Sequence, residues 1–72
     1  MSDYNIEQLD SFTNAETGIR YAIHLYDARW ESDKDFWMVT QYDTEAGQYI
    51  ERTKCTDFEI AAARYAVMVT AS

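Results

Sequence analysis

The sequence predicts an α+β fold in which an antiparallel sheet of four strands is followed by one C-terminal helix packed on a face of the sheet (β-β-β-β-α). Two observations carry this prediction. Residues 19–26 alternate apolar and polar side chains with the two-residue period of a half-buried strand. Residues 57–70 are rich in alanine and repeat apolar side chains at helical spacing. A chain of 72 residues is one domain at most, so we expect residues 1–72 to share one small core.

The first two strands are predicted to form a hairpin. Residues 4–12 and 19–26 are separated by the polar segment 13–18, which ends in a glycine and is typical of a turn. The apolar residues of segment 4–12 also recur at three-residue spacing, so a short helix is the alternative for this first element.

A second hairpin is predicted further along the chain. Residues 36–42 are rich in aromatic and β-branched side chains, and residues 48–53 have a similar character. The five residues between them, 43–47, end in a glycine and indicate a turn. The strand register stays open, because a one-residue change in loop length decides whether Ile50 shares a face with Met38 or with Val39.

The start of the helix has a specific signal. Thr56 and Glu59 fit a capping box, in which each side chain accepts a hydrogen bond from the backbone N–H of the other residue. The helix then presents one apolar stripe to the sheet, made of Phe58, Ala61, Ala62, Tyr65 and Val69.

The opposite side of this helix, which we call the helix back, is also apolar. It carries Ile60, Ala63, Val67 and Ala71. One sheet cannot cover both sides of a helix, so we expect the helix back to meet a second subunit or a target. The alternative is that these side chains are exposed singly, as many apolar residues of soluble proteins are.

The charge balance restricts the class of partner. Thirteen Asp and Glu residues stand against six Lys and Arg residues, which gives a formal net charge of −7. Affinity for nucleic acid depends on Lys and Arg that neutralise phosphates, so we expect no direct binding of nucleic acid. The acidity serves either solubility alone or the binding of a basic protein surface, such as one that normally holds DNA or RNA.

The compartment is predicted from cysteine usage and hydropathy. A single cysteine, Cys55, cannot form an internal disulfide, whereas small secreted domains usually need several. No apolar run is long enough to span a membrane, and the first ten residues hold three acids and no base, unlike a secretory leader. We therefore expect a cytoplasmic protein that does not associate with membranes.

No pattern in the sequence is typical of catalysis or cofactor binding. Residues 31–35 place three carboxylates at alternating positions, but Phe36 stands where a calcium loop needs glycine and Tyr42 where it needs glutamate. Cys55 precedes a helix start, where a thiol can become reactive, yet we interpret it as a packing residue against Ile60. We expect no enzyme activity, no cofactor and no metal.

Acidic side chains are predicted to gather at the two ends of the sheet and to bind the partner there. In an up-and-down sheet, the loop that follows the second strand lies at the same end as the junction between the fourth strand and the helix. That end would hold Asp27, Glu31, Asp33, Asp35, Asp57 and Glu59. The turn between the third and fourth strands would place Asp43 and Glu45 at the opposite end.

In size, acidity and order of elements, the chain resembles the small phage-encoded anti-CRISPR proteins, in particular inhibitors of multi-subunit type I effector complexes. The resemblance implies an inhibitor that acts in the cytoplasm of the host cell. It would occupy a basic channel of the effector and prevent recognition of target DNA by steric block and charge mimicry. The competing hypothesis is an assembly module, a homodimer formed through the helix back or a sheet edge instead of a monomer.

Overall fold

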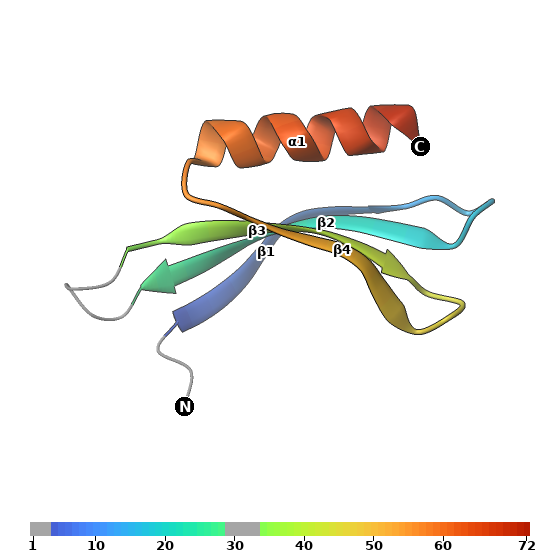
Figure 1. Ribbon diagram of the computed structural model, residues 1–72, viewed down its shortest axis with the longest axis horizontal. Coiled ribbons are helices and arrows are strands. Elements are labelled where there is room, and N and C mark those ends of the chain that lie inside the picture. The colour runs from blue at the N-terminus through green and yellow to red at the C-terminus, as the bar shows by residue number, and fades with distance from the viewer. Residues whose placement is uncertain (1–3, 29–33) are drawn as a thin grey trace.

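The computed structural model describes residues 4–28 and 34–72, and it confirms the α+β fold. One sheet and one helix form two layers, with the helix lying across one face of the sheet (Figure 1). The elements in chain order are β1 (Tyr4–Thr13), β2 (Ile19–Ala28), β3 (Phe36–Asp43), β4 (Gln48–Cys55) and α1 (Phe58–Ala71). The first element is thus a strand, and the alternative of a short helix is wrong.

The sheet is an antiparallel meander in which neighbouring strands in sequence are neighbours in space, in the order β1-β2-β3-β4. Gly18 and Gly47 close the two hairpin turns with φ of 73° and 72°, a backbone conformation that glycine adopts without steric cost. The turns also bind each other, because the backbone N–H of Thr44 donates to the carbonyl of Gly18 at 3.0 Å. This contact ties the two hairpins together at one end of the sheet.

Two β-bulges fix the register that the sequence left open. On β1 the pairing steps from Gln8 to Asp10, so Leu9 is the extra residue. On β4 Glu51 and Tyr49 pair with consecutive residues of β3, so Ile50 is the extra residue there. Each bulge moves the following residues of its strand to the other face.

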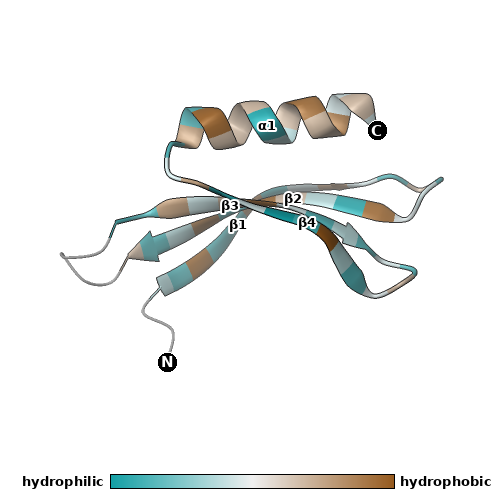
Figure 2. Ribbon diagram, in the orientation of Figure 1, coloured by the Kyte–Doolittle hydropathy of each residue, from teal (hydrophilic) through white to brown (hydrophobic). Residues whose placement is uncertain are grey.

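The hydrophobic core is small and lies between the sheet and the helix. Its buried members come one from each of four elements: Ile23, Val39, Cys55 and Ala61. Trp37 from β3 and Tyr65 and Met68 from α1 pack around them. Figure 2 shows apolar residues on the helix and on the strands that lie beneath it. Ala61 is completely buried, and its small side chain lets the helix approach the sheet closely.

The helix begins one residue later than predicted, and its N-cap is Asp57 instead of Thr56. The backbone of Asp57 is extended, with φ −126° and ψ 126°, and its carboxylate accepts a hydrogen bond from the backbone N–H of Glu59 at 2.9 Å. Its carbonyl accepts the first helical bond, from Ala61. The cap is shifted because β4 continues to Cys55, which leaves Thr56 and Asp57 to turn the chain upward.

The packing role predicted for Cys55 is confirmed, but its predicted neighbour is wrong. The thiol is buried in the core beside Ala61, whereas Ile60 points away from the sheet and is 60% exposed. Cys55 is the last residue of β4 and pairs with Trp37. A strand residue at this position faces the helix, which explains why it joins the core.

The helix covers only one of the two faces of the sheet. It packs mainly on β2 and β3, with fewer contacts to β4. The other face of the sheet, which we call the uncovered face, has no layer of described residues against it (Figure 1). The fold therefore leaves two broad surfaces for interaction, namely the uncovered face and the helix back.

Candidate interaction surfaces

The predicted acidic residues lie at both ends of the sheet, as expected from the meander. The end that holds the β2–β3 connection and the start of α1, which we call the loop end, carries Asp27, Asp35, Asp57 and Glu59. All four side chains are exposed. Two further predicted members of this group, Glu31 and Asp33, lie outside the described residues.

Two of the carboxylates at the loop end are held by backbone hydrogen bonds. Asp35 accepts from the backbone N–H of Ala28 at 2.8 Å, across the mouth of the β2–β3 connection. Asp57 accepts from the N–H of Glu59 as the helix cap. These bonds use part of each carboxylate and fix its direction, so the charges sit at defined positions on the surface.

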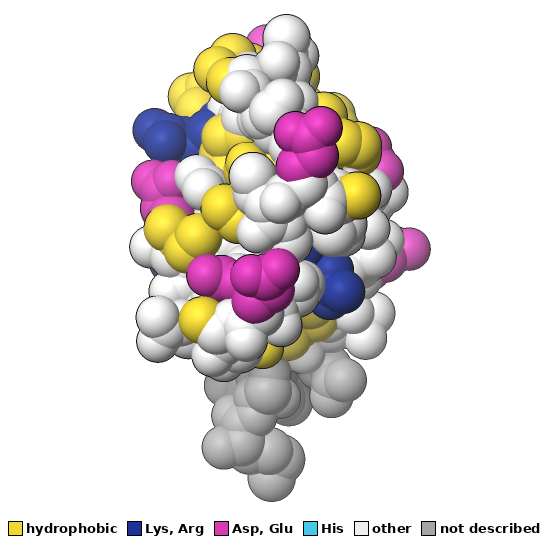
Figure 3. Space-filling view, turned by 90° about the vertical axis from the view of Figure 1, so that its right-hand side faces the viewer, with side chains coloured by type: hydrophobic (Ala, Val, Ile, Leu, Met, Phe, Trp, Pro, Cys, Tyr) yellow, Lys and Arg dark blue, Asp and Glu magenta, His cyan; other side chains and the backbone are white. Residues whose placement is uncertain are grey.

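The opposite end of the sheet, which we call the turn end, carries Asp43 and Glu45 together with Glu16. Asp43 has a structural role there, because its Oδ1 atom accepts from the N–H of Glu45 at 3.0 Å and of Ala46 at 3.1 Å. Figure 3 looks onto this end and shows acidic side chains at separate places among apolar and uncharged ones. The turn end is acidic without forming one continuous acidic patch.

The helix back is exposed and apolar, as the sequence indicates. Ile60 and Val67 are 60% and 68% exposed. Together with Ala63, Arg64 and Met68 they line a shallow groove of about 390 Å³ along the helix. Nothing within the described part of the chain packs on this groove.

The uncovered face of the sheet is basic, which sequence reasoning missed. The register places the side chains of Arg20, Arg52 and Lys54 on this face, three of the six Lys and Arg residues of the chain. Within the described residues, no strand position whose side chain points to this face is occupied by Asp or Glu. These three cations are therefore separated from the acidic residues of the described strands, whereas Lys34 lies beside Asp35 at the loop end.

Aromatic rings lie next to these cations. The Nζ atom of Lys54 lies 4.3 Å from the ring centroid of Phe36, and the guanidinium carbon of Arg52 lies 5.0 Å from that of Tyr49. Phe36 stacks on Tyr26 with centroids 4.6 Å apart, while Tyr49 meets Tyr42 edge to face at 4.9 Å. The uncovered face thus carries two clusters, each made of rings with a cation above them.

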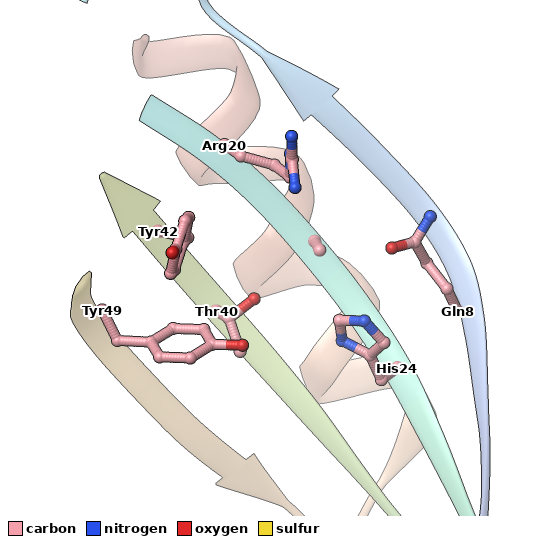
Figure 4. A pocket seen from close by; sticks show the side chains of 7 residues that line it. Gln8, Arg20, His24, Thr40, Tyr42 and Tyr49 are labelled. Carbon is pink, nitrogen blue, oxygen red and sulfur yellow. The ribbon is translucent and has the colours of Figure 1, made fainter. Parts of the chain in front are cut away.

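A hollow of about 440 Å³ opens on this face beside the second cluster (Figure 4). Its lining comes from all four strands: Gln8, Arg20, Ala22, His24, Thr40, Tyr42 and Tyr49. Ala22 and Thr40 are the most buried of these residues, at 3% and 5% exposed, and the longer side chains of the lining surround them. The side chains therefore make a walled depression on a face that no layer of described residues covers.

The surroundings of the hollow change the pKa of His24. Partial burial lowers the pKa of His24 from its ordinary value, and the nearby positive charge of Arg52 lowers it further. Both effects disfavour the imidazolium form. At neutral pH the hollow therefore presents a neutral imidazole next to permanent guanidinium charges.

The alternation of residues within two strands contains the signal for this basic face. Arg20 and His24 are an even number of residues apart in β2, as Arg52 and Lys54 are in β4. Each pair must share a face of its own strand. Only the register of β2, β3 and β4, which the bulge in β4 shifts by one residue, shows that both pairs lie on the same face of the sheet.

Within residues 4–28 and 34–72, no three His, Cys, Asp or Glu side chains converge in a way that could hold a metal ion. In the same part of the chain, no helix is long and apolar enough to cross a bilayer. Comparison with protein-family models, curated proteins and solved structures gives no match. What the protein binds must therefore be inferred from the charge and geometry of its own surfaces.

Proposed function

We propose that the protein is a non-catalytic binding protein whose loop end docks on a basic surface of another macromolecule. The observation that supports this proposal most is the gathering of four exposed carboxylates from three separate chain segments at one end of the sheet. With a net charge of −7, the molecule would be steered toward a positively charged partner before contact.

The hydrogen bonds at the loop end favour binding over mere solubility. Asp35 and Asp57 are oriented by backbone N–H groups of Ala28 and Glu59 before any partner arrives. A charge that is already fixed loses little conformational entropy when it binds, so more of its interaction energy contributes to affinity.

The partner that fits this charge is a basic channel that normally holds nucleic acid. From the resemblance of the chain to anti-CRISPR proteins in size, acidity and element order, we propose a type I effector complex as this partner. On this proposal, a phage-encoded inhibitor in the host cytoplasm prevents target recognition by filling the channel. Neither a cofactor nor a chemical step is required.

A competition experiment tests the proposal. Purified type I effector complexes are incubated with labelled target DNA and increasing amounts of the protein, and bound DNA is measured by gel shift. We expect the protein to displace DNA in a dose-dependent manner and to co-purify with the complex. Undiminished DNA binding across the tested type I complexes would contradict this partner.

A second candidate function is that of a homodimeric assembly module. It is favoured by the exposure of Ile60 and Val67 along the groove of the helix back. The uncovered face is a poor dimer interface, since two copies would bring their cations together. Light scattering coupled to size exclusion distinguishes a dimer from a monomer.

A further inference from the structure

We propose that the uncovered face of the sheet is a binding site for single-stranded nucleic acid. This surface lies on the opposite side of the sheet from the helix, and the inference does not depend on the function proposed for the loop end. It rests on three features of the face, namely its charge, the arrangement of its rings and the hollow between them.

The charge of this face is opposite to that of the whole molecule. Arg20, Arg52 and Lys54 point outward from it, and no carboxylate accompanies them at the described strand positions. Exposed charges farther away than about 8 Å are largely screened at physiological ionic strength, so a bound phosphate responds mainly to these neighbours. The net charge of −7 therefore weakens the site without abolishing it.

The rings form two separate clusters, which allows contact with more than one base. The Phe36 and Tyr42 clusters are six residues apart on β3, which corresponds to about 20 Å along a strand. Each cluster combines a ring face with Lys54 or Arg52. Such a repeat matches a ligand in which planar bases alternate with phosphates, because bases stack on aromatic side chains while cations follow the backbone.

The hollow supplies polar groups that an extruded base can meet. Its volume of about 440 Å³ lies in the range of small-ligand sites. A base on its floor would have the rings of Tyr42 and Tyr49 on one side, and the amide of Gln8 and the imidazole of His24 on the other (Figure 4). Arg20 stands at the rim, where it can reach a phosphate.

Other polyanions match the face less well. The bases of a duplex are stacked on each other and are not free to stack on the rings. An acidic peptide would use the cations but has no planar bases to stack on the rings. Single-stranded nucleic acid uses both features.

The test measures binding of the full chain to fluorescein-labelled oligo(dT) and oligo(U) of about 12 nucleotides by fluorescence anisotropy, a length within the range that single small domains cover. A duplex of the same length and an oligoglutamate peptide are the competing probes. At about 50 mM salt, we expect the single strands to bind at least about tenfold more tightly than either competitor, through stacking of bases on the rings.

Variants assign the binding to this face. Arg52→Ala should weaken binding several-fold and reduce the slope of log affinity against log salt by about 0.7, the value for one phosphate contact on a single strand. Tyr49→Leu, at a ring that is 52% exposed, should weaken binding about tenfold through lost stacking. Arg64→Ala, which removes a cation from the helix back, is the matched control and should leave affinity and slope unchanged.

Circular dichroism and thermal melting establish that the variants are folded, and Arg52→Gln replaces Arg52→Ala if the latter is not. Three results would each overturn the inference. The first is an unaltered anisotropy of both oligonucleotides at low salt. The second is equal binding of the duplex or the peptide. The third is an equal loss of affinity in Arg64→Ala and Arg52→Ala.

Discussion

The ring centroids of Trp37 on β3 and Phe58 at the start of α1 lie 5.7 Å apart, and the two ring planes are inclined by 55°. This contact joins the helix to the sheet at the loop end. It also lies next to the acidic residues proposed to bind the partner, because Asp57 immediately precedes Phe58. The docking of this ring therefore contributes to the positions of Asp57 and Glu59, the two loop-end carboxylates that flank Phe58.

Phe58→Ala should loosen the start of the helix. We expect a loss of about 1–2 kcal/mol in the free energy of unfolding, less than for a fully buried ring because Phe58 is half exposed. Urea denaturation followed by circular dichroism measures it. Ile60→Ala on the helix back is the control and should change stability by less than about 0.5 kcal/mol. Equal effects of the two changes would mean that the ring contact contributes nothing specific.

The helix cap gives a second prediction. Asp57→Ala removes the acceptor for the N–H of Glu59 and should cost about 1 kcal/mol of stability. Thr56→Ala, one residue earlier, should cost less than about 0.5 kcal/mol. Thermal melts of the two variants compare them directly. A larger effect of Thr56→Ala would restore the capping box predicted from the sequence.

His24 should titrate below its ordinary pKa of roughly 6.5, because burial and then Arg52 disfavour its charged form. The unfolded chain then takes up a proton as the pH falls through about 6.5 while the folded protein does not. The contribution of neutral His24 to the free energy of unfolding is therefore complete above about pH 6.5. It is lost as the pH falls toward the pKa of His24 in the folded protein. In His24→Gln, the decrease in the free energy of unfolding that the His24 titration causes below about pH 6.5 should be absent.

NMR measures the pKa of His24 without ambiguity, since the chain has a single histidine. Arg52→Ala should raise it toward the ordinary value, because one of the two causes is removed. A pKa at or above about 6.5 in the unaltered protein would show that neither burial nor Arg52 acts as described.

The helix back is tested by adding charge to it. If it closes a homodimer, Ile60→Glu combined with Val67→Glu should convert the dimer to a folded monomer, because two carboxylates would have to be desolvated in the contact. Ala15→Glu combined with Ala46→Glu adds the same charge at exposed turn positions and should leave the dimer intact. A monomeric unaltered protein in light scattering would remove the assembly module from consideration.

Local patterns were sufficient to predict the element order, because strand alternation and helical spacing are properties of short segments. The register was not predictable, since the extra residues Leu9 and Ile50 are ordinary apolar strand residues and carry no bulge signal such as a glycine. The same limit hid the basic face, because Arg20 and Arg52 come from strands that are not neighbours. The acidic ends were predictable because loop positions follow from topology alone.

Replacing carboxylates by amides at one end of the sheet at a time tests whether the partner binds at the loop end or responds only to the net negative charge of the molecule. The triple variant Asp27→Asn, Asp35→Asn and Glu59→Gln changes the loop end. The matched triple variant Glu16→Gln, Asp43→Asn and Glu45→Gln changes the turn end. Amide oxygens can still accept the backbone hydrogen bonds that Asp35 and Asp43 accept, so both variants should stay folded.

The most direct measurement of the central claim is the rate at which each triple variant associates with a type I effector complex, recorded over a range of salt concentrations. We predict that the loop-end variant associates about tenfold more slowly than the unaltered protein and shows a flatter salt dependence. The turn-end variant should stay within about twofold of the unaltered protein. Equal losses in the two variants, or a rate indifferent to both and to salt, would contradict binding through the loop end.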